Sequence, residues 1–167
     1  IHETQRMEHW DTFDPRARYT YEAICTSEVM CNPVPGRGMA YMGVFQDRDR
    51  AWLMGERSYR LRVPAGVPAS LFWSTVCYDN RTRTLIDTDQ QAATVGSKTD
   101  GLRVNDDGSV DVLYGPESPG AEWETNWVKT IPGKGFFVYF RLYGVEQPFF
   151  DKTWQLPLVA PIDFATI

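Results

Sequence analysis

The sequence predicts an all-β protein, an antiparallel β-sandwich or jelly roll of about eight strands with one N-terminal helix. Two observations support this prediction. After Gly38 hydrophobic and polar residues alternate with a period of two, in short runs rich in β-branched and aromatic residues. Clusters of Gly, Pro, Asp and Asn separate these runs, and little between them has helical spacing.

Length and composition limit the class of protein. The chain has 167 residues, which suits one domain, and 43% of them are hydrophobic, as in a folded globular protein. A net charge of −5 argues against non-specific binding to nucleic acid. No apolar run reaches the roughly 20 residues that a membrane-spanning helix needs. We therefore expect no nucleic-acid partner and no membrane span.

One amphipathic helix is predicted ahead of the strands, over residues 14–31. Asp14 is suited to cap this helix, and Pro15 is suited to its first turn. A turn-rich stretch over residues 32–38 ends it. The predicted organisation is therefore a helical linker segment, residues 1–38, followed by a β-sandwich domain, residues 39–167.

The predicted strands follow in order, each bounded by turn residues. The turn at residues 105–109 joins two of them as a hairpin, because it contains Asp and Gly in succession. The strands are expected at residues 40–46, 58–63, 71–79, 83–87, 102–105, 110–114, 123–130 and 136–143.

The sequence contains few residues suited to histidine or cysteine catalysis or to metal binding. His2 and His9 lie ahead of the predicted sandwich, so no histidine-based catalytic site is expected within it. The three cysteines lack zinc-binding spacing, and Cys25 and Cys31 could form a disulfide only if the chain turns between them. Paired aspartates would suit Mg²⁺ or Ca²⁺, but they lie in predicted turns, where aspartate bonds its own backbone. No cofactor is therefore predicted.

Several segments together are similar to a known family. They are Tyr59 to Pro64, Phe72 to Asp79, Asp107 to Ser109, Asn126 with Trp127, Gly135 to Gly144, and Trp154. In order and spacing they resemble the C-terminal domain of a bacterial two-domain family catalogued as domain of unknown function 1214. The resemblance covers most of the chain after residue 38 and implies an all-β sandwich or jelly roll with no settled activity.

The same resemblance bears on partners and location. In this family another uncharacterised domain, number 1254, usually precedes the matching one. The resemblance therefore implies that the chain is the C-terminal part of a larger polypeptide and has that N-terminal domain as a partner. It also favours a periplasmic or secreted location, although no signal peptide is visible in the printed sequence.

An arginine between two tyrosines is the first candidate for ligand binding. The last predicted strand has one apolar face, and its other face carries Tyr139, Arg141 and Tyr143. The second predicted strand carries Arg60 and Arg62 on its polar face. If these polar faces adjoin, three arginines converge and could hold a phosphate or a carboxylate. Separate surface ion pairs are the alternative.

Three tryptophans are further candidates. Trp73 lies in a strand with aromatic residues on both faces, so it is either a core residue or a ligand contact. Trp123 and Trp127 are predicted on one strand face, where flat rings could stack on a sugar. The opposite face of that strand carries Glu122, Glu124 and Asn126. Two carboxylates there would suit acid–base hydrolysis, or would simply mark an exposed edge.

Three functions follow from these patterns. The first is an accessory domain that recognises a carbohydrate or a small anionic metabolite on its arginine- and aromatic-rich sheet face. The second is a hydrolase of phosphate or glycosyl bonds whose site is shared with the N-terminal domain. The third is a structural module that forms homo-oligomers through aromatic surfaces. The ligand-binding candidates are Arg141, Tyr139, Tyr143, Arg60, Arg62, Trp73, Trp123, Asn126 and Trp127.

Overall fold

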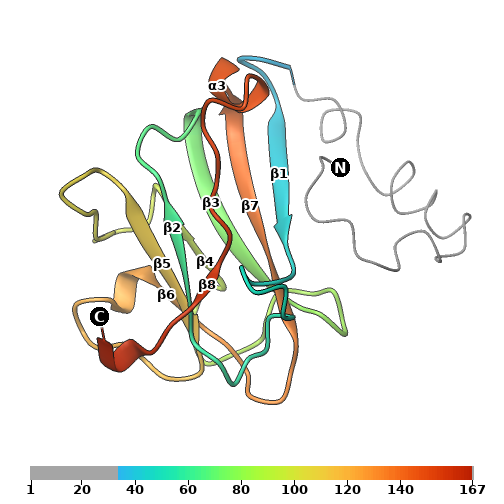
Figure 1. Cartoon of the computed structure of the whole chain (residues 1–167), viewed down its shortest axis with the longest axis vertical. Coiled ribbons are helices and arrows are strands. Elements are labelled where there is room, and N and C mark those ends of the chain that lie inside the picture. The colour runs from blue at the N-terminus through green and yellow to red at the C-terminus, as the bar shows by residue number, and fades with distance from the viewer. Residues whose placement is uncertain (1–33, 167) are drawn as a thin grey trace, which may run out of the picture.

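A computed structural model describes residues 34–166 and places eight strands among them, in two four-stranded sheets (Figure 1). The first sheet has the order β1-β7-β3-β4 and contains β1 (Met39–Val44), β7 (Phe136–Val145), β3 (Ala69–Asp79) and β4 (Thr94–Gly96). The second has the order β6-β5-β2-β8 and contains β6 (Trp127–Lys129), β5 (Val110–Gly115), β2 (Tyr59–Val63) and β8 (Ala160–Pro161). The all-β sandwich prediction is confirmed.

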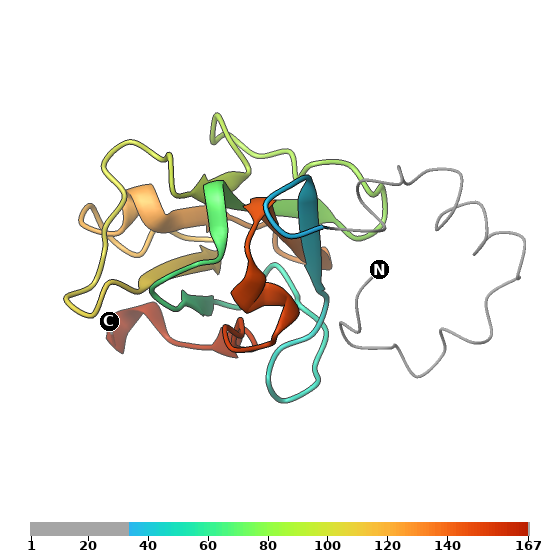
Figure 2. The same cartoon turned by 90° about the horizontal axis from the view of Figure 1, so that it is seen from above.

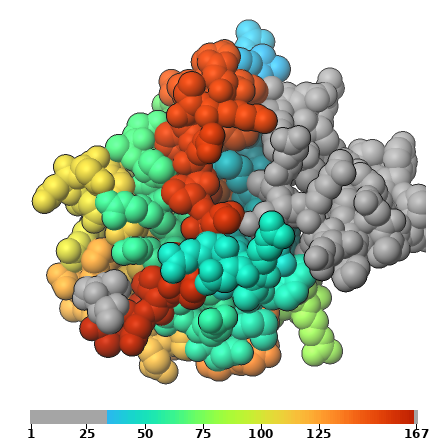
Figure 3. Space-filling model, viewed as in Figure 1, coloured from blue at the N-terminus to red at the C-terminus, as the bar shows by residue number. Residues whose placement is uncertain are grey.

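The centre of the first sheet is the antiparallel pair of β3 and β7, which runs from Ala69 opposite Val145 to Asp79 opposite Phe136. Viewed from above, β1 and the C-terminal end of the chain lie on opposite sides of the molecule (Figure 2). The chain after β7 passes through the short helix α3 (Gln147–Phe150) and then runs down the surface toward the C-terminus (Figure 3). A 3-10 turn, η4 (Phe164–Thr166), follows β8.

The core between the sheets is built from the inward residues that the period of two predicts. Phe140 of β7 stacks on Trp73 of β3, with ring centroids 5.4 Å apart. Phe136 reaches across the sandwich to Tyr59 of β2, at 5.8 Å. Burying a side chain of this size contributes about 1.5–3 kcal/mol to stability, and the contact between Phe136 and Tyr59 joins the two sheets.

One strand pair departs from the antiparallel prediction. β5 and β6 pair in parallel, with Leu113 opposite Trp127. The connection between them runs over residues 116–126 and includes the 3-10 turn η3 (Glu124–Asn126). A parallel pair needs such a crossover, because a tight hairpin always reverses the chain.

Three predicted strands differ from the structure. Residues 83–87 form only an isolated bridge, between Leu85 and Tyr78. Residues 102–105 form no strand, because the side chain of Asn126 bonds both backbone groups of Arg103. In the stretch predicted at 123–130, only Trp127–Lys129 is extended enough to pair. The short strands β4 and β8 were not predicted, since two or three residues carry no detectable alternation.

The helix predicted over residues 14–31, and with it the Cys25–Cys31 question, lies outside the described residues. Among residues 34–166 no helix is long and apolar enough to cross a membrane.

Candidate functional site

Aromatic side chains cover much of the outward surface of the first sheet. We call this surface the outer aromatic face, and it comprises Tyr41, Phe45, Phe72, Tyr78, Phe137, Tyr139 and Tyr143. Five of these rings form one contact cluster around Tyr139, and Phe72 and Tyr143 form a separate pair. Phe72 stacks on Tyr143 with centroids 4.0 Å apart, and Phe137 stacks on Tyr78 at 5.2 Å. Such stacked pairs add about 0.5–1.5 kcal/mol each beyond simple burial.

Arg141 is the cation within this face. It lies on β7 between Tyr41 of β1 and Ser74 of β3. Its guanidinium carbon is 5.3 Å from the ring centroid of Tyr41 and 5.8 Å from that of Tyr78. One terminal nitrogen donates a hydrogen bond to the Tyr78 hydroxyl. The guanidinium is therefore held in place by aromatic neighbours, through cation–π attraction and one directional bond.

The positive charge of Arg141 has no counter-charge within the described structure. No carboxylate of residues 34–166 lies within ion-pair distance of its guanidinium. Its Nε is buried and makes no hydrogen bond within the described part of the chain. Burying part of a charge is costly unless a partner compensates it. Arg141 therefore keeps hydrogen-bonding capacity that an anion could use.

A groove of about 860 Å³ lies directly beside Arg141. Arg141, Val76 and Tyr78 line it from the first sheet. The other wall is the segment of residues 84–94, which links β3 to β4. Thr84, Thr88, Gln91 and Thr94 give this wall hydroxyl and amide groups, while Ile86 adds an apolar side chain and Asp87 a carboxylate. A volume of this size suits a small metabolite.

Tyr139 and Tyr41, two tyrosines near Arg141, stay neutral at physiological pH. Burial raises the pKa of Tyr139 above its ordinary value, and the neighbouring Tyr78 adds to the effect. Burial also raises the pKa of Tyr41, together with the nearby Tyr143. Arg141 opposes both shifts without reversing them. Their hydroxyls therefore remain protonated and can donate hydrogen bonds.

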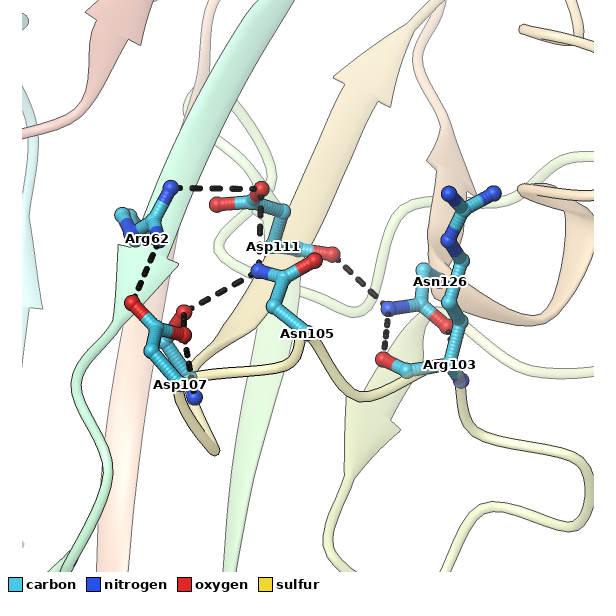
Figure 4. A network of polar contacts seen from close by, with 7 residues as sticks. Arg62, Arg103, Asn105, Asp107, Asp111 and Asn126 are labelled. Atoms are coloured by element: carbon cyan, nitrogen blue, oxygen red, sulfur yellow. Dashed lines mark hydrogen bonds and ion pairs between the residues drawn. The ribbon is translucent and has the colours of Figure 1, made fainter.

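The other two candidate arginines lie elsewhere. Arg60 and Arg62 are on β2, in the second sheet, so the expected convergence with Arg141 does not occur. Arg62 instead forms an ion pair with Asp107 at 2.7 Å and faces Asp111 at 3.9 Å (Figure 4). For Arg62 the surface ion pair is therefore the better interpretation.

The network around Arg62 is structural in character. The Asn105 amide donates to the Ser109 hydroxyl at 3.0 Å and to Asp111 at 3.2 Å. The Ser109 hydroxyl and backbone N–H, helped by Arg62, lower the pKa of Asp107 to about 2. These bonds fix the hairpin between residues 105 and 109 against β2 and β5 (Figure 4). The described residues contain no group of three acidic, histidine or cysteine side chains able to hold a metal ion.

Asn126 joins this region to the segment before the hairpin. It is fully buried, and its amide donates to the backbone oxygens of Arg103 and Asp111, each at 2.9 Å (Figure 4). Its Oδ1 accepts the Arg103 N–H at 2.8 Å. All its polar atoms therefore serve the fold, and none faces a ligand site.

Trp123 and Trp127 do not share a strand face, contrary to expectation. Trp123 precedes the turn η3, Trp127 begins β6, and both are buried with Leu113 in a small second core. The Trp127 indole N–H donates to the Gly115 carbonyl at 3.0 Å. The Arg103 guanidinium covers Trp123 at 3.9 Å. Neither ring is therefore free to stack on a sugar.

Each of the two carboxylates predicted beside these tryptophans binds a different partner. Glu122 pairs with Arg103 at 2.8 Å, and Glu124 accepts a hydrogen bond from Ser118 at 2.6 Å. Trp73 points inward and is only 7% exposed, but it lines a second pocket at one end of the sandwich.

Of the predicted site residues, only Arg141 and Trp73 line either of these two pockets. Tyr139 and Tyr143 lie on the same sheet face as Arg141.

Fold and site together define a β-sandwich domain with a groove beside Arg141, at one edge of an aromatic sheet face. The chain belongs to the family described as protein of unknown function DUF1214, whose model matches residues 38–147. No curated protein matches the sequence. The association with a preceding domain of type 1254 stays a prediction.

Two solved structures share the fold. The VPA0106 protein from Vibrio parahaemolyticus is 23% identical, with a TM-score of 0.65 over 75% of this chain. An uncharacterised protein from Burkholderia cenocepacia is 18% identical, with a TM-score of 0.52 over 78% of this chain. At these identities the likeness concerns the fold alone. The chain spans 31% of the length of each of these proteins.

Proposed function

We propose that this domain binds a small anionic metabolite bearing hydroxyl groups, such as a sugar acid, in the groove over Arg141. The observation that supports the proposal most directly is the uncompensated guanidinium of Arg141, a residue that lines that groove. A carboxylate there would gain charge-assisted hydrogen bonds and offset the cost of burying the charge.

The surroundings of Arg141 favour a hydroxylated ligand over a simple inorganic anion. The wall residues Thr88 and Gln91 offer hydroxyl and amide groups to ligand hydroxyls. Val76 and Tyr78 add apolar surface for the body of the ligand. A planar guanidinium matches a carboxylate through two parallel bonds, which a lysine cannot do.

The sandwich is also proposed to act within a longer polypeptide, with residues 1–38 as a linker to an N-terminal domain. The solved proteins that share its fold are about three times as long as the part that matches. A periplasmic or secreted location remains part of this proposal, on the family resemblance alone. The hydrolase and homo-oligomer alternatives stay predictions.

Isothermal titration calorimetry with D-glucuronate tests the proposal, with neutral D-glucose as the comparison ligand. We expect glucuronate to bind with a Kd of about 1 mM or below, and D-glucose to bind at least about tenfold more weakly. Arg141→Gln should abolish the difference between the two ligands, and Arg141→Lys should restore part of it.

Arg60→Gln is the matched control, because it removes the same charge from the other sheet. It should leave glucuronate affinity unchanged. Equal loss of affinity in Arg60→Gln and Arg141→Gln would contradict a site at Arg141. Absence of saturable binding for glucuronate, malate and inorganic phosphate alike would overturn anion binding in this groove.

A further inference from the structure

A second pocket, of about 430 Å³, opens at the end of the sandwich where the chain passes from β2 into β3. Both sheets contribute to it. Val63 and Val110 line it from the second sheet, and Ala69 and Trp73 line it from the first. We call it the end pocket. Most of the residues that line it are apolar, and Ser97, Lys98 and backbone groups add polar surface.

Small residues form one side of the end pocket. The loop after β2 contributes Ala65 and Gly66, and the hairpin after residue 105 contributes Gly108. Gly66 and Gly108 have φ values of 67° and 77°, a conformation that favours glycine. A Cβ on Gly108 would lie 3.2 Å from the Cβ of Ala65, so these two chain segments already approach closely.

A β-bulge shapes the rim of the end pocket. The register of β3 against β7 shifts between Ala69 and Phe72, and the Ser70 hydroxyl donates to the Gly144 carbonyl at 3.0 Å. The bulge turns Leu71 outward, where 68% of it is exposed although it lines the pocket. Bulges commonly re-aim a side chain in this way beside binding sites. An apolar rim of this kind favours an apolar ligand.

Lys98 supplies the charged group of the end pocket. It is the one charged side chain among the residues that line the pocket. Its ammonium lies 4.5 Å from the ring centroid of Phe72, which Tyr143 stacks against from the sheet. No carboxylate of residues 34–166 is within ion-pair distance of Lys98. The ammonium is therefore held at the rim by an aromatic ring and can pair with an anion.

We propose that the end pocket binds a flat apolar ligand with one anionic end, an aryl carboxylate. The ring would enter between Trp73 and Leu71, and the carboxylate would meet the Lys98 ammonium at the rim. This site is separate from the groove over Arg141, because the residues that line the two have no member in common. It does not depend on the function proposed for that groove.

Phenylacetate and neutral 2-phenylethanol are the probes, titrated against the whole chain by saturation-transfer NMR and calorimetry. Phenylacetate should bind with a Kd on the order of 1 mM, as expected for a ligand of this size. Lys98→Met should weaken phenylacetate about five- to tenfold and leave 2-phenylethanol unchanged. Leu71→Ser should weaken both probes and should not unfold the domain, since Leu71 is largely exposed.

Lys134→Met is the matched control, because it removes the same charge near Asp79, at the other end of β3. It should leave both affinities unchanged, and saturating glucuronate should not displace phenylacetate. Equal weakening by Lys98→Met and Lys134→Met would overturn the assignment of the carboxylate to Lys98. Failure of both probes to bind saturably, or unchanged affinity in Leu71→Ser, would overturn the end pocket as a site for aryl ligands.

Discussion

Arg141 of β7 donates a hydrogen bond to the hydroxyl of Tyr78, although its partner residue on β3 is Ser74. The arginine side chain therefore runs along the sheet surface, past the position of Val76, to reach the tyrosine. This course brings the guanidinium beside the groove bounded by residues 84–94. The Tyr78 hydroxyl thus positions the group that we propose meets the ligand.

Tyr78→Phe should loosen Arg141 without removing its charge. We expect glucuronate to bind about three- to fivefold more weakly, because the guanidinium loses its only hydrogen-bond acceptor among the described residues. The free energy of unfolding should fall by no more than about 1 kcal/mol, since the ring is kept. Calorimetry and urea unfolding measure the two effects. An affinity equal to that of the unmodified protein would show that Tyr78 does not position Arg141.

Asn126→Ala should destabilise the domain more than any surface substitution. It leaves the N–H and carbonyl of Arg103 and the carbonyl of Asp111 without their partner. We expect a loss of about 2–4 kcal/mol in the free energy of unfolding, measured in urea. Asn105→Ala is the control, because the amide of the Asn105 side chain bonds only other side chains, and it should cost about 1 kcal/mol. Equal costs for the two variants would contradict the role of Asn126.

The carboxyl of Asp107 should titrate well below an ordinary aspartate. Its pKa is lowered to about 2 by the Ser109 hydroxyl, the Ser109 backbone N–H and Arg62. Because this pKa lies below the unfolded value of about 3.9, the ionised form stabilises the fold above about pH 4. That stabilisation is lost as the pH falls toward 2.

Carbon-13 NMR of the Asp107 carboxyl measures this pKa directly. Ser109→Ala should raise the midpoint, because the Ser109 hydroxyl is the largest single cause of the shift. In urea unfolding, the difference between the unmodified protein and Asp107→Asn should be full at pH 7 and shrink below pH 4. A midpoint near 4 for Asp107 would refute the network drawn in Figure 4.

The thiol of Cys77 should be unreactive toward alkylating reagents in the folded protein. It is fully buried on β3, and burial raises the pKa of its thiol well above the ordinary range, with a further contribution from Asp79. In a variant with Cys25→Ser and Cys31→Ser, we expect iodoacetamide at pH 8 to react at least about 100-fold more slowly than in urea. Equal rates in the two conditions would show that β3 opens readily.

Most of the sandwich could be predicted because long strands keep a strict alternation. β7 is the clearest case, since its inward residues Phe136 and Phe140 are buried and its outward Tyr139 and Arg141 are half-buried. The run at residues 83–87 alternates too, but it only bridges Tyr78 at one point. Alternation alone cannot tell a strand from an extended loop that lies along a sheet edge.

The candidate site was predictable only in part. The exposure of Arg141 among tyrosines follows from its position on β7, and this part of the prediction depends on local pattern alone. No local pattern in the sequence indicates that residues 84–94 form the wall of a groove. None indicates that Lys98 lines the end pocket. Short polar segments of this kind acquire a role only from the surfaces they are folded against.

The sequence by itself determined the fold class and the two faces of each long strand, because a period of two is a local property of the backbone. Only the tertiary structure decided which faces meet. It placed Arg60 and Arg141 in different sheets, and it buried Trp127 in a second core. The reason is physical: strand order depends on contacts between residues far apart in the chain, and no local pattern records them.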